Sequence, residues 1–334
     1  MRVAFFGSSR LSCLVLKALL QSPHEVAVVI TQPDQPAGRA MALTPTHLCV
    51  DALDAGLPVL KPERVRSNPR FRAELMEHKP EAFMVTAYGQ IISKKVLALV
   101  QWPLNVHPSL LPRLRGASPM RTALLQGLKC TGCCVMKMTP RLDDGDILLR
   151  EEINIPLDWD HGELEDAMGG LGGRLALQAL DSVASGSVKL TPQDEEAATY
   201  CSTYTRADTW IDWSRPAARL YDFIRAWSPD IGACTNLPDG KRLKIWQATT
   251  QQPPGEEKPE VYADAPPGNA APGTVLTAAK MGLWVNTGDG ALRIVELQPE
   301  NRARMSAASF LAGRRLKAGD RLGAGRAGRR ARHP

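Results

Sequence analysis

Short apolar strands alternate with helical stretches through the first half of this chain. The strands are predicted at 3–6, 24–30 and 82–87, and the helices around 11–16 and 71–77. Strands that alternate with helices along the chain indicate a parallel, doubly wound sheet. The turn after the first strand also occurs in dinucleotide enzymes. However, its Gly-Ser-Ser-Arg at 7–10 lacks the spaced glycines of the Rossmann fingerprint, so a dehydrogenase is not expected.

The second half of the chain follows a different pattern from about Trp210. One helix is predicted at 217–227, and short strands separated by turns follow it at 241–246, 273–276, 282–287 and 291–297. This arrangement favours a small barrel of the OB type, with a long proline-rich loop over 253–272. The expected fold class is therefore α/β: an N-terminal Rossmann-like, doubly wound, mostly parallel sheet and a C-terminal OB-like β-barrel domain.

A length of 334 residues also favours two domains over one. We expect a first domain over 1–186, a linker over 187–206, the OB-like domain over 207–312 and a basic tail over 313–334. The first domain is expected to end in a helix over 160–186. A cluster of four glycines should weaken it, and the sequence offers no physical reason for them: Gly169, Gly170, Gly172 and Gly173.

The charge of the chain lies mainly at its C-terminal end. The net charge is +6, and residues 311–334 alone carry eight Arg or Lys and one Asp. Such a tail favours an anionic partner such as RNA, although for residues 324–334 a solvated, disordered end is at least an equal interpretation. No segment has the length of apolar sequence that a membrane span needs, and the N-terminus is no secretory signal. We therefore expect a cytoplasmic protein, with no membrane partner, that works as a monomer.

The seven cysteines do not form a disulfide or metal framework in the sequence. Cys130, Cys133 and Cys134 cluster, but a zinc site usually needs a second pair at suitable spacing, and none appears. Residues 130–136 are predicted to be a turn entering a buried strand. We expect no metal site.

Asn105, His107 and Asp143 form the set of residues that most indicates chemistry. Asn105 and His107 are two apart, so on an extended segment both side chains point to one face. Pro108 then ends the strand, at the place where open α/β sheets bind ligands. Acyl transfer to an amine needs a donor for the developing oxyanion, a proton shuttle and a group that orients the shuttle, and these three side chains supply them. The alternatives without a catalytic role are a polar strand end for Asn105 and His107 and an Asp-Gly turn for Asp143.

The motifs resemble those of the folate-dependent formyltransferases. The similar segments are Asn-Val-His-Pro-Ser-Leu-Leu-Pro at 105–112, Arg-Gly-Ala at 115–117 with Pro119, and Leu-Asp-Asp-Gly-Asp-Ile at 142–147. Downstream segments resemble the tRNA-acting branch, the methionyl-tRNA formyltransferases; they are 211–214, 224–226, 271–274, 287–290, 298–299, 305–307 and 313–317. The similarity reaches to about residue 323.

The resemblance implies 10-formyltetrahydrofolate as the formyl donor and the α-amine of initiator methionyl-tRNA as the acceptor. It makes 1–186 the catalytic domain, with Asn105, His107 and Asp143 as catalytic residues. Folate contacts are implied at Tyr88, Gly89, Gln90, Ile91, Ser109, Leu110, Leu111, Pro112 and Asp146. Contacts with tRNA are implied at Gly38, Arg39, Arg314, Arg315 and Lys317.

The sequence departs from the family pattern at three places. Lysines commonly follow the residue that matches Arg39, whereas 40–42 here is Ala-Met-Ala, which predicts weaker phosphate contact from this loop. Ser-Pro-Met-Arg at 118–121 replaces Ala-Pro-Ile-Gln, and 8–10 lacks the usual Thr-Pro; both leave the amine pocket undefined. The alternatives are a formyltransferase for a small amine (a sugar nucleotide or a purine precursor) and a non-catalytic RNA-binding protein.

Overall fold

The computed structural model describes residues 1–37, 41–251, 270–279, 282–313 and 316–323. The chain forms two compact units. The first contains 1–120, 129–157 and 163–203, and the second contains 121–128, 158–162 and 204–334. The expected loop over 253–272 lies mostly outside the described residues.

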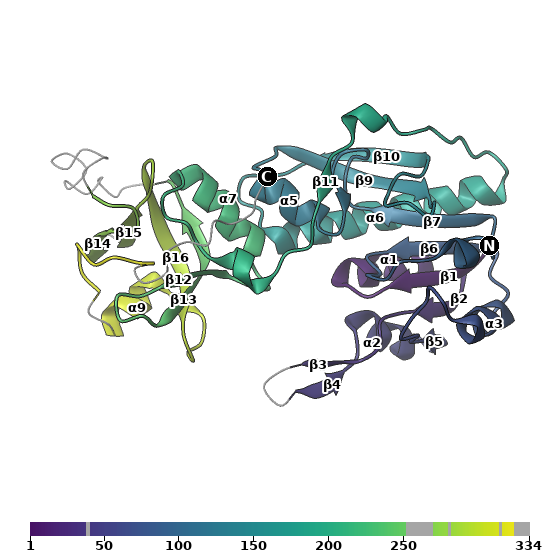
Figure 1. Ribbon diagram of the computed structural model, residues 1–334, viewed down its shortest axis with the longest axis horizontal. Helices are drawn as coiled ribbons and strands as arrows, with labels where there is room; N and C mark the ends of the chain where they lie inside the picture. The colour runs from purple at the N-terminus through teal and green to yellow at the C-terminus, as the bar shows by residue number, and fades with distance from the viewer. Residues whose placement is uncertain (38–40, 252–269, 280–281, 314–315, 324–334) are drawn as a thin grey trace. The chain divides into compact units, whose positions relative to one another are not determined.

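A seven-stranded sheet forms the centre of the first unit (Figure 1). Its strands in spatial order are β10 (Ile147–Asn154), β9 (Cys130–Lys137), β7 (Trp102–His107), β6 (Ala82–Thr86), β1 (Arg2–Gly7), β2 (Glu25–Ile30) and β5 (Val59–Leu60). The five strands from β7 to β5 are parallel, and β9 runs antiparallel to both β7 and β10. The expected Rossmann-like sheet is confirmed. The strand at 130–137 begins at Cys130 itself, and the turn that precedes it lies at 126–127 and not within 130–136 as expected.

Helices follow most of the strands of this sheet. They are α1 (Arg10–Leu20), α2 (His47–Asp54), α3 (Pro69–Glu77), α4 (Lys94–Leu97), α5 (Pro119–Leu125) and α6 (His161–Ala184). Side chains at their first turns cap several of them. Ser9 accepts a hydrogen bond from the Ser12 N–H, and Asn68 accepts one from the Phe71 N–H at 3.0 Å. Residues of β1, β2 and β6 pack with those of α3 and α4 in one buried cluster.

Three glycines of α6 allow this helix to approach α1 and the sheet closely. A Cβ built on Gly169 would lie 2.2 Å from a Leu14 side-chain carbon, and one on Gly173 would lie 2.7 Å from the Ala18 Cβ. A Cβ on Gly172 would lie 2.8 Å from a Val106 methyl group of β7. Only glycine leaves room for this packing, and the packing stabilises the helix despite its poor intrinsic propensity.

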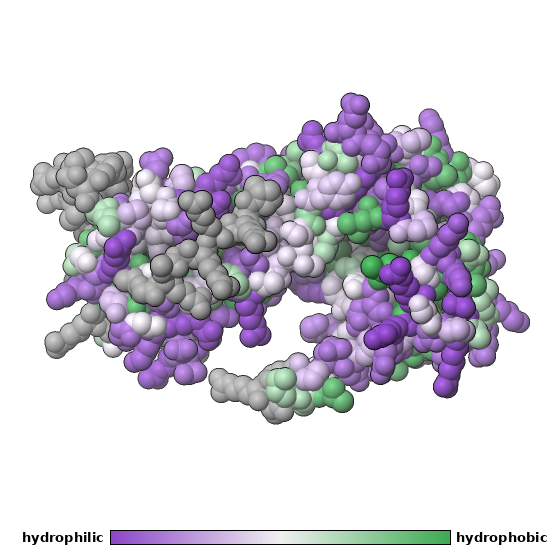
Figure 2. Space-filling model, in the orientation of Figure 1, coloured by the Kyte–Doolittle hydropathy of each residue, from purple (hydrophilic) through white to green (hydrophobic). Residues whose placement is uncertain are grey.

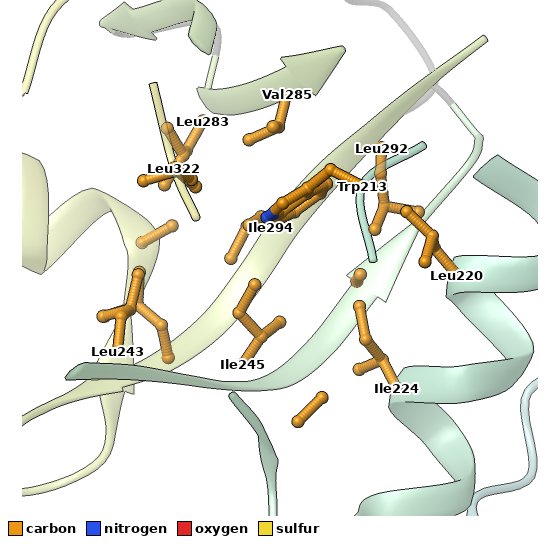
Figure 3. Close-up of a cluster of buried hydrophobic side chains, with 14 of the residues drawn as sticks. Trp213, Leu220, Ile224, Leu243, Ile245, Leu283, Val285, Leu292, Ile294 and Leu322 are labelled. Atoms are coloured by element: carbon orange, nitrogen blue, oxygen red, sulfur yellow. The ribbon is translucent and has the colours of Figure 1, made fainter. Parts of the chain in front are cut away.

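The second unit is built on an antiparallel sheet. Its order is β12 (Ala233–Asn236), β13 (Arg242–Thr249), β16 (Ala291–Pro299), β15 (Gly282–Asn286) and β14 (Val275–Ala279), with β17 (Met305–Ser306) paired to β16. Helices α7 (Ala217–Trp227) and α9 (Ala307–Gly313) belong to the same unit. Its core gathers side chains from strands and α7 around Trp213, as Figure 3 shows, and the Trp213 indole donates to the Thr235 hydroxyl at 3.0 Å. These strands confirm the expected barrel-like domain.

The segment expected as the linker contains short pieces of structure. They are the 3₁₀ turn η1 (Glu195–Ala197) and the strand β11 (Tyr200–Cys201), which pairs in parallel with β8 (Arg115–Gly116); a second 3₁₀ turn, η2 (Arg206–Thr209), begins at the end of the segment. A hairpin of β3 (Gln35–Ala37) and β4 (Ala42–Thr44) extends from the first unit. No helix in the described ranges is both long enough and apolar enough to cross a membrane.

Candidate active site

Strand β7 places Asn105 and His107 on one face of the sheet, as the sequence predicts. Asn105 pairs with Val85 of β6 and with Met136 of β9, and His107 pairs with Cys134. Val106, between them, points to the opposite face, where it meets Gly172 of α6. Both polar side chains are almost fully buried, with 7% of Asn105 and 4% of His107 exposed. A buried amide and a buried imidazole at a strand end need partners or a ligand.

The His107 ring has a defined partner at each nitrogen. Its Nε2 lies 3.0 Å from the backbone carbonyl oxygen of Leu114, and its Nδ1 lies 3.7 Å from Oδ2 of Asp143. A carbonyl oxygen only accepts hydrogen bonds, so Nε2 carries the proton in the neutral ring. This leaves the Nδ1 lone pair facing the side of the carboxylate.

Asp143 reaches His107 because the loop after β9 folds back over the sheet. The end of β9 at Lys137 pairs with Leu104, yet Asp143 lies beside His107 at the other end of β7. The N–H of Gly116 donates to Asp143 Oδ2 at 2.8 Å. Gly145 lies so close to the Lys137 carbonyl that a Cβ there would be 1.7 Å from the oxygen. The Asp-Asp-Gly-Asp run is therefore a turn, and this turn brings a carboxylate to the imidazole.

The Asn105 amide has no hydrogen-bond partner within the described part of the chain. Its neighbours on the strands beside it are the apolar Val85 and Met136. An amide left unpaired in such surroundings is able to donate to a carbonyl oxygen that a ligand brings.

Two residues that contact His107, and Ala87 directly after β6, have positive φ angles that residues other than glycine rarely adopt. They are Ala87 at 46°, Leu114 at 57° and Asp143 at 48°. Each such residue costs on the order of 1–3 kcal/mol, and they concentrate at functional sites. Leu114 supplies the carbonyl for Nε2 and Asp143 supplies the carboxylate, so both unusual conformations serve the same ring.

Four residues after β6 are expected to contact folate. Some of them pack in the protein core, and others remain accessible to a ligand. The Tyr88 ring is 3% exposed and packs edge-on against Phe6 with centroids 5.4 Å apart, so it belongs to the core, where burial raises the pKa of its phenol. Gly89 has a φ of 81°, and the Gln90 amide accepts from the Val65 N–H at 3.1 Å. The Ile91 side chain is 68% exposed and remains open to a ligand.

The second expected folate segment is largely a packed loop. The Ser109 hydroxyl donates to the Arg113 carbonyl at 2.7 Å, and Leu111 lies in a buried cluster with three other side chains. Leu110 packs against Gly132 of β9, where a Cβ would lie 2.4 Å from its methyl carbon. Pro112 is half-buried, and so is Asp146, whose backbone carbonyl accepts from the Lys137 N–H at 2.9 Å. The segment therefore forms part of the floor beside β7.

Most residues expected to contact tRNA lie outside the described residues, namely Gly38, Arg39, Arg314 and Arg315. Lys317 is described, and it is exposed. On the hairpin of β3 and β4, Met41 is 66% and Leu43 72% exposed. Figure 2 shows the corresponding hydrophobic surface on this hairpin.

Arg121 lies in the second unit, although its sequence position suggested the amine pocket. Its guanidinium bonds to Asp230 at 3.0 Å and lies over the Trp227 ring, 4.6 Å from the centroid. The side chain is 8% exposed. Arg121 is thus held by its own unit and is not a free group of the His107 site.

The cysteines of β9 are buried thiols. Burial raises the pKa of Cys134 to about 12 and raises that of Cys133 further above its usual range. Neither thiol therefore ionises near neutrality, which thiolate ligation requires. Within the described ranges, no three metal-ligating side chains come together.

Sequence reasoning missed the residues that hold the three central ones. The Leu114 carbonyl and the Gly116 N–H are backbone groups, so only their positions, Gly116 inside the similar 115–117 segment and Leu114 just before it, could have pointed to them. Gln193 was missed as well. Its amide donates to the carbonyls of Asp143 and Gly145 at 2.9 and 2.7 Å. No motif marks a glutamine in a segment that reads as a linker.

A Rossmann-like sheet with an amide, an imidazole and a carboxylate at one strand end defines an α/β transferase with acid–base machinery. Family models agree, since residues 1–180 match the formyl transferase family and residues 204–315 match the formyl transferase C-terminal domain. Methionyl-tRNA formyltransferase of Symbiobacterium thermophilum is 40% identical over 96% of this chain and 95% of its own length. That of Bacillus subtilis is 38% identical over 96% and 98%. The chain belongs to the methionyl-tRNA formyltransferase family.

Solved structures share the fold at lower identity. HypX from Aquifex aeolicus in complex with tetrahydrofolic acid is 18% identical, with a TM-score of 0.61 over 93% of this chain and 47% of that one. WlaRD, a sugar 3N-formyl transferase, is 16% identical, with a TM-score of 0.61 over 91% and 99%. At these identities the likeness supports the fold alone.

Proposed function

We propose that this protein transfers the formyl group of 10-formyltetrahydrofolate to the α-amine of methionine esterified to initiator tRNA. Family membership and the names of the relatives support this reaction. The observation that carries it is the meeting of His107 and Asp143 beside the unpaired Asn105 amide. The product is N-formylmethionyl-tRNA for translation initiation.

The transfer exchanges one carbon–nitrogen bond for another. The amine nitrogen of the acceptor forms a bond to the formyl carbon, and the bond from that carbon to N10 of the folate breaks. One proton leaves the attacking nitrogen, and one is gained by N10, so no oxidant, reductant or metal is required by the balance. The chain must therefore stabilise the carbonyl oxygen and carry a proton from one nitrogen to the other.

His107 suits the proton transfer through its Nδ1 atom. Because Nε2–H donates to the Leu114 carbonyl at 3.0 Å, the ring cannot turn and Nδ1 is the nitrogen that accepts. The Asp143 carboxylate, 3.7 Å away, stabilises the positive ring that forms when Nδ1 takes the proton. The charged ring then returns the proton to the leaving nitrogen.

Asn105 suits the oxyanion role. Its side chain extends from β7 to the same face as the imidazole, and nothing else in the described chain occupies its amide. When the amine attacks, the formyl oxygen gains negative charge, and an N–H donor aimed at it strengthens its bond at that moment. Loss of such a donor typically costs about 2.7–4 kcal/mol of activation free energy.

The loop after β6 has the properties that binding of a flat folate ring requires. Gly89 has no Cβ, and a Cβ there would meet only the Gln32 amide at 3.2 Å, so the backbone is open to close approach. Ile91 and Leu142 are large apolar side chains left 68% and 59% exposed, and they would gain from covering a ring. We assign the folate contacts to Gly89, Gln90 and Ile91, with Leu110, Pro112 and Asp146 at the edge of the site.

The remaining predictions from the sequence are carried as part of this proposal. The region 1–186 acts as the catalytic domain, 187–206 connects it to the OB-like domain at 207–312, and the latter binds tRNA together with the basic tail. Gly38, Arg39, Arg314, Arg315 and Lys317 contact the tRNA. The enzyme works as a cytoplasmic monomer.

Formylation of charged tRNA tests the proposal directly. The purified protein is incubated with 10-formyltetrahydrofolate and either initiator methionyl-tRNA, elongator methionyl-tRNA, an amino sugar nucleotide or glycinamide ribonucleotide. We expect the initiator methionyl-tRNA to react with the highest kcat/KM. Faster reaction of a small amine would replace this function with that of a small-molecule formyltransferase. Binding of tRNA without any transfer would leave an RNA-binding protein.

A further inference from the structure

The side chain of Gln193 uses all four of its hydrogen-bonding positions. Its Nε2 donates to the carbonyls of Asp143 and Gly145 at 2.9 and 2.7 Å. Its Oε1 accepts from Nε and Nη2 of Arg115 at 3.1 and 2.9 Å. An amide with two donors and two occupied lone pairs is fully satisfied, and its orientation is therefore fixed. Gln193 thus connects the turn that carries Asp143 to Arg115.

Arg115 is itself firmly anchored in the same unit. Its side chain is 1% exposed and forms a salt bridge to Glu195 at 2.9 Å, which holds the pKa of that carboxyl below its usual range. Its backbone N–H donates to the Thr199 carbonyl at 2.8 Å. The next residue, Gly116, donates to Oδ2 of Asp143. The Arg115–Gly116 segment therefore holds Asp143 twice, at its carboxylate directly and at its carbonyl through Gln193.

The same stretch of chain also fixes the other side of His107. The Thr199 hydroxyl accepts from the Leu114 N–H at 2.9 Å, and the Cys201 thiol donates to the Leu114 carbonyl at 3.6 Å. That carbonyl is the partner of His107 Nε2. Residues 193–201 thus contact both groups that flank the imidazole, although they follow α6 and lie far from β7 in sequence.

Asp143 needs such support because its backbone is in the left-handed region, with a φ of 48°. A non-glycine residue stays there only where its surroundings determine it more than once. If the turn relaxed, the carboxylate would leave its place 3.7 Å from His107 Nδ1. Misplacement by about 1 Å of a group at a reacting centre can cost about a hundredfold in rate.

We propose that Gln193 is a positioning residue for formyl transfer, which acts by holding the Asp143 turn so that the carboxylate faces His107. This inference rests on the proposed function, because Gln193 would hold in place a residue of the same site. Gln193 does not touch substrate. Its effect passes through the carbonyls of Asp143 and Gly145, and the contact with Arg115 serves to fix the amide.

Two substitutions separate this role from a merely structural one. Gln193→Glu keeps an acceptor for Arg115 but places carboxylate oxygens against the two carbonyls, which they repel. Gln193→Leu loses both contacts. If Gln193 positions Asp143, both variants lower kcat at least about tenfold and leave KM for methionyl-tRNA within about twofold. If Gln193 only links Arg115 into the fold, Gln193→Glu keeps the wild-type kcat, and that result overturns the proposal.

Asn68→Ala serves as the matched control for lost stability. It removes the cap of α3 in the same unit, at a residue with no contact to His107 or Asp143, so its Tm should fall while kcat stays at the wild-type value. Assays run well below every Tm. A kcat loss in Asn68→Ala equal to that of the Gln193 variants would attribute the whole effect to stability and remove the proposal.

A measurement on the substrate-free protein keeps this inference separate from the function. In ¹⁵N NMR of the intact chain with labelled histidine, the ring signals of His107 should change in both Gln193 variants and stay unchanged in Asn68→Ala. Unchanged His107 signals in Gln193→Glu would overturn the positioning role, even if formyl transfer itself is established. Absence of formyl transfer by the wild-type protein, with the NMR change present, would overturn the function and leave the geometry of Gln193 standing.

Discussion

Oδ2 of Asp143 lies 2.8 Å from the Gly116 nitrogen but 3.7 Å from Nδ1 of His107. The carboxylate is therefore held by the main chain, and the imidazole sits just beyond hydrogen-bonding distance. This arrangement fixes a negative charge beside Nδ1 without occupying its lone pair. In the proposed reaction, this pair suits a ring that becomes positive only when it takes a proton from substrate.

Asp143→Asn should lower kcat by about 10²–10⁴-fold, the range that acid–base machinery contributes. The fold should survive, because the asparagine oxygen can still accept from Gly116. The kcat is measured by single-turnover formylation of methionyl-tRNA. Asp144→Asn is the matched control, since it removes a charge from the same turn at a side chain that pairs with Arg141 and Thr139. Equal losses in both variants would contradict the role of Asp143.

Asn105→Ala should lower kcat by about 10²–10³-fold and leave KM for methionyl-tRNA nearly unchanged. The amide has no partner in the described chain before substrate arrives, so its main bond forms as charge develops on the formyl oxygen. Steady-state kinetics at saturating folate give both constants. A rise in KM at constant kcat would show instead that Asn105 only binds the substrate.

The sheet and the central residues of the site could be predicted because both leave short-range signals. Buried parallel strands are apolar runs, and Asn105 and His107 share a face simply because they are two apart on β7. The helix over 160–186 was predicted within two residues at each end, although its glycines opposed it. The reason for Gly169 and Gly173 lies in α1, more than 140 residues earlier in the chain, where Leu14 and Ala18 fill the space.

The support of the site could not be predicted because it consists of backbone groups and of contacts across long sequence separations. Leu114 acts through its carbonyl and Gly116 through its N–H, and neither role depends on the identity of a side chain. Gln193 meets Asp143 fifty residues away, within a segment that has no periodic pattern. For Arg121, in contrast, the sequence suggested a place near the active site that the structure does not give it. It lies next to a similar motif, but its partner Asp230 belongs to the second unit.

Adjacent glycines of α6 should respond to alanine in opposite directions. Gly169→Ala should destabilise the protein by about 1–3 kcal/mol, because the new Cβ would lie 2.2 Å from one Leu14 carbon and 2.5 Å from its Cβ. Gly170→Ala meets nothing within 4 Å and should stabilise by about 0.5–1 kcal/mol through helix propensity. Urea unfolding followed by circular dichroism measures both. Destabilisation by Gly170→Ala would contradict the packing described for α6.

Arg39→Ala should weaken tRNA binding and make it less dependent on salt. The 40–42 segment carries no lysine, so under the proposed function we expect Arg39 to be the cation of this loop that contacts phosphate. Removal of one phosphate contact lowers the slope of log K against log salt by about one. Filter binding of methionyl-tRNA at several salt concentrations gives the slope, with Lys61→Ala as the control because Lys61 is paired with Asp34. A slope unchanged by Arg39→Ala would place the phosphate contacts elsewhere, with the C-terminal tail as the next candidate.

The second unit should lose stability as the pH falls from about 6.5 to about 4. Burial, together with the nearby positive charge of Arg121 and against the opposing effect of Asp230, lowers the pKa of His161 from 6.5 to about 4. His161 is thus neutral in the folded protein, whereas the unfolded chain binds a proton below pH 6.5. The contribution of His161 to stability is fully present above the pKa of the unfolded chain. It is lost as the pH falls to the pKa of the folded protein, and the free energy of unfolding decreases by no more than about 3 kcal/mol.

Tryptophan fluorescence follows this loss selectively, because six of the seven tryptophans lie in the second unit. The unfolding free energy is measured in urea between pH 4 and 7 for the wild type, for His161→Gln and for His47→Gln. His161→Gln should flatten the slope over this range, since glutamine takes up no proton in either state. His47→Gln, at an exposed residue of α2 in the first unit, should keep the wild-type slope. If His161→Gln also keeps it, the acid sensitivity of this unit comes from its carboxyl groups and not from the half-buried imidazole.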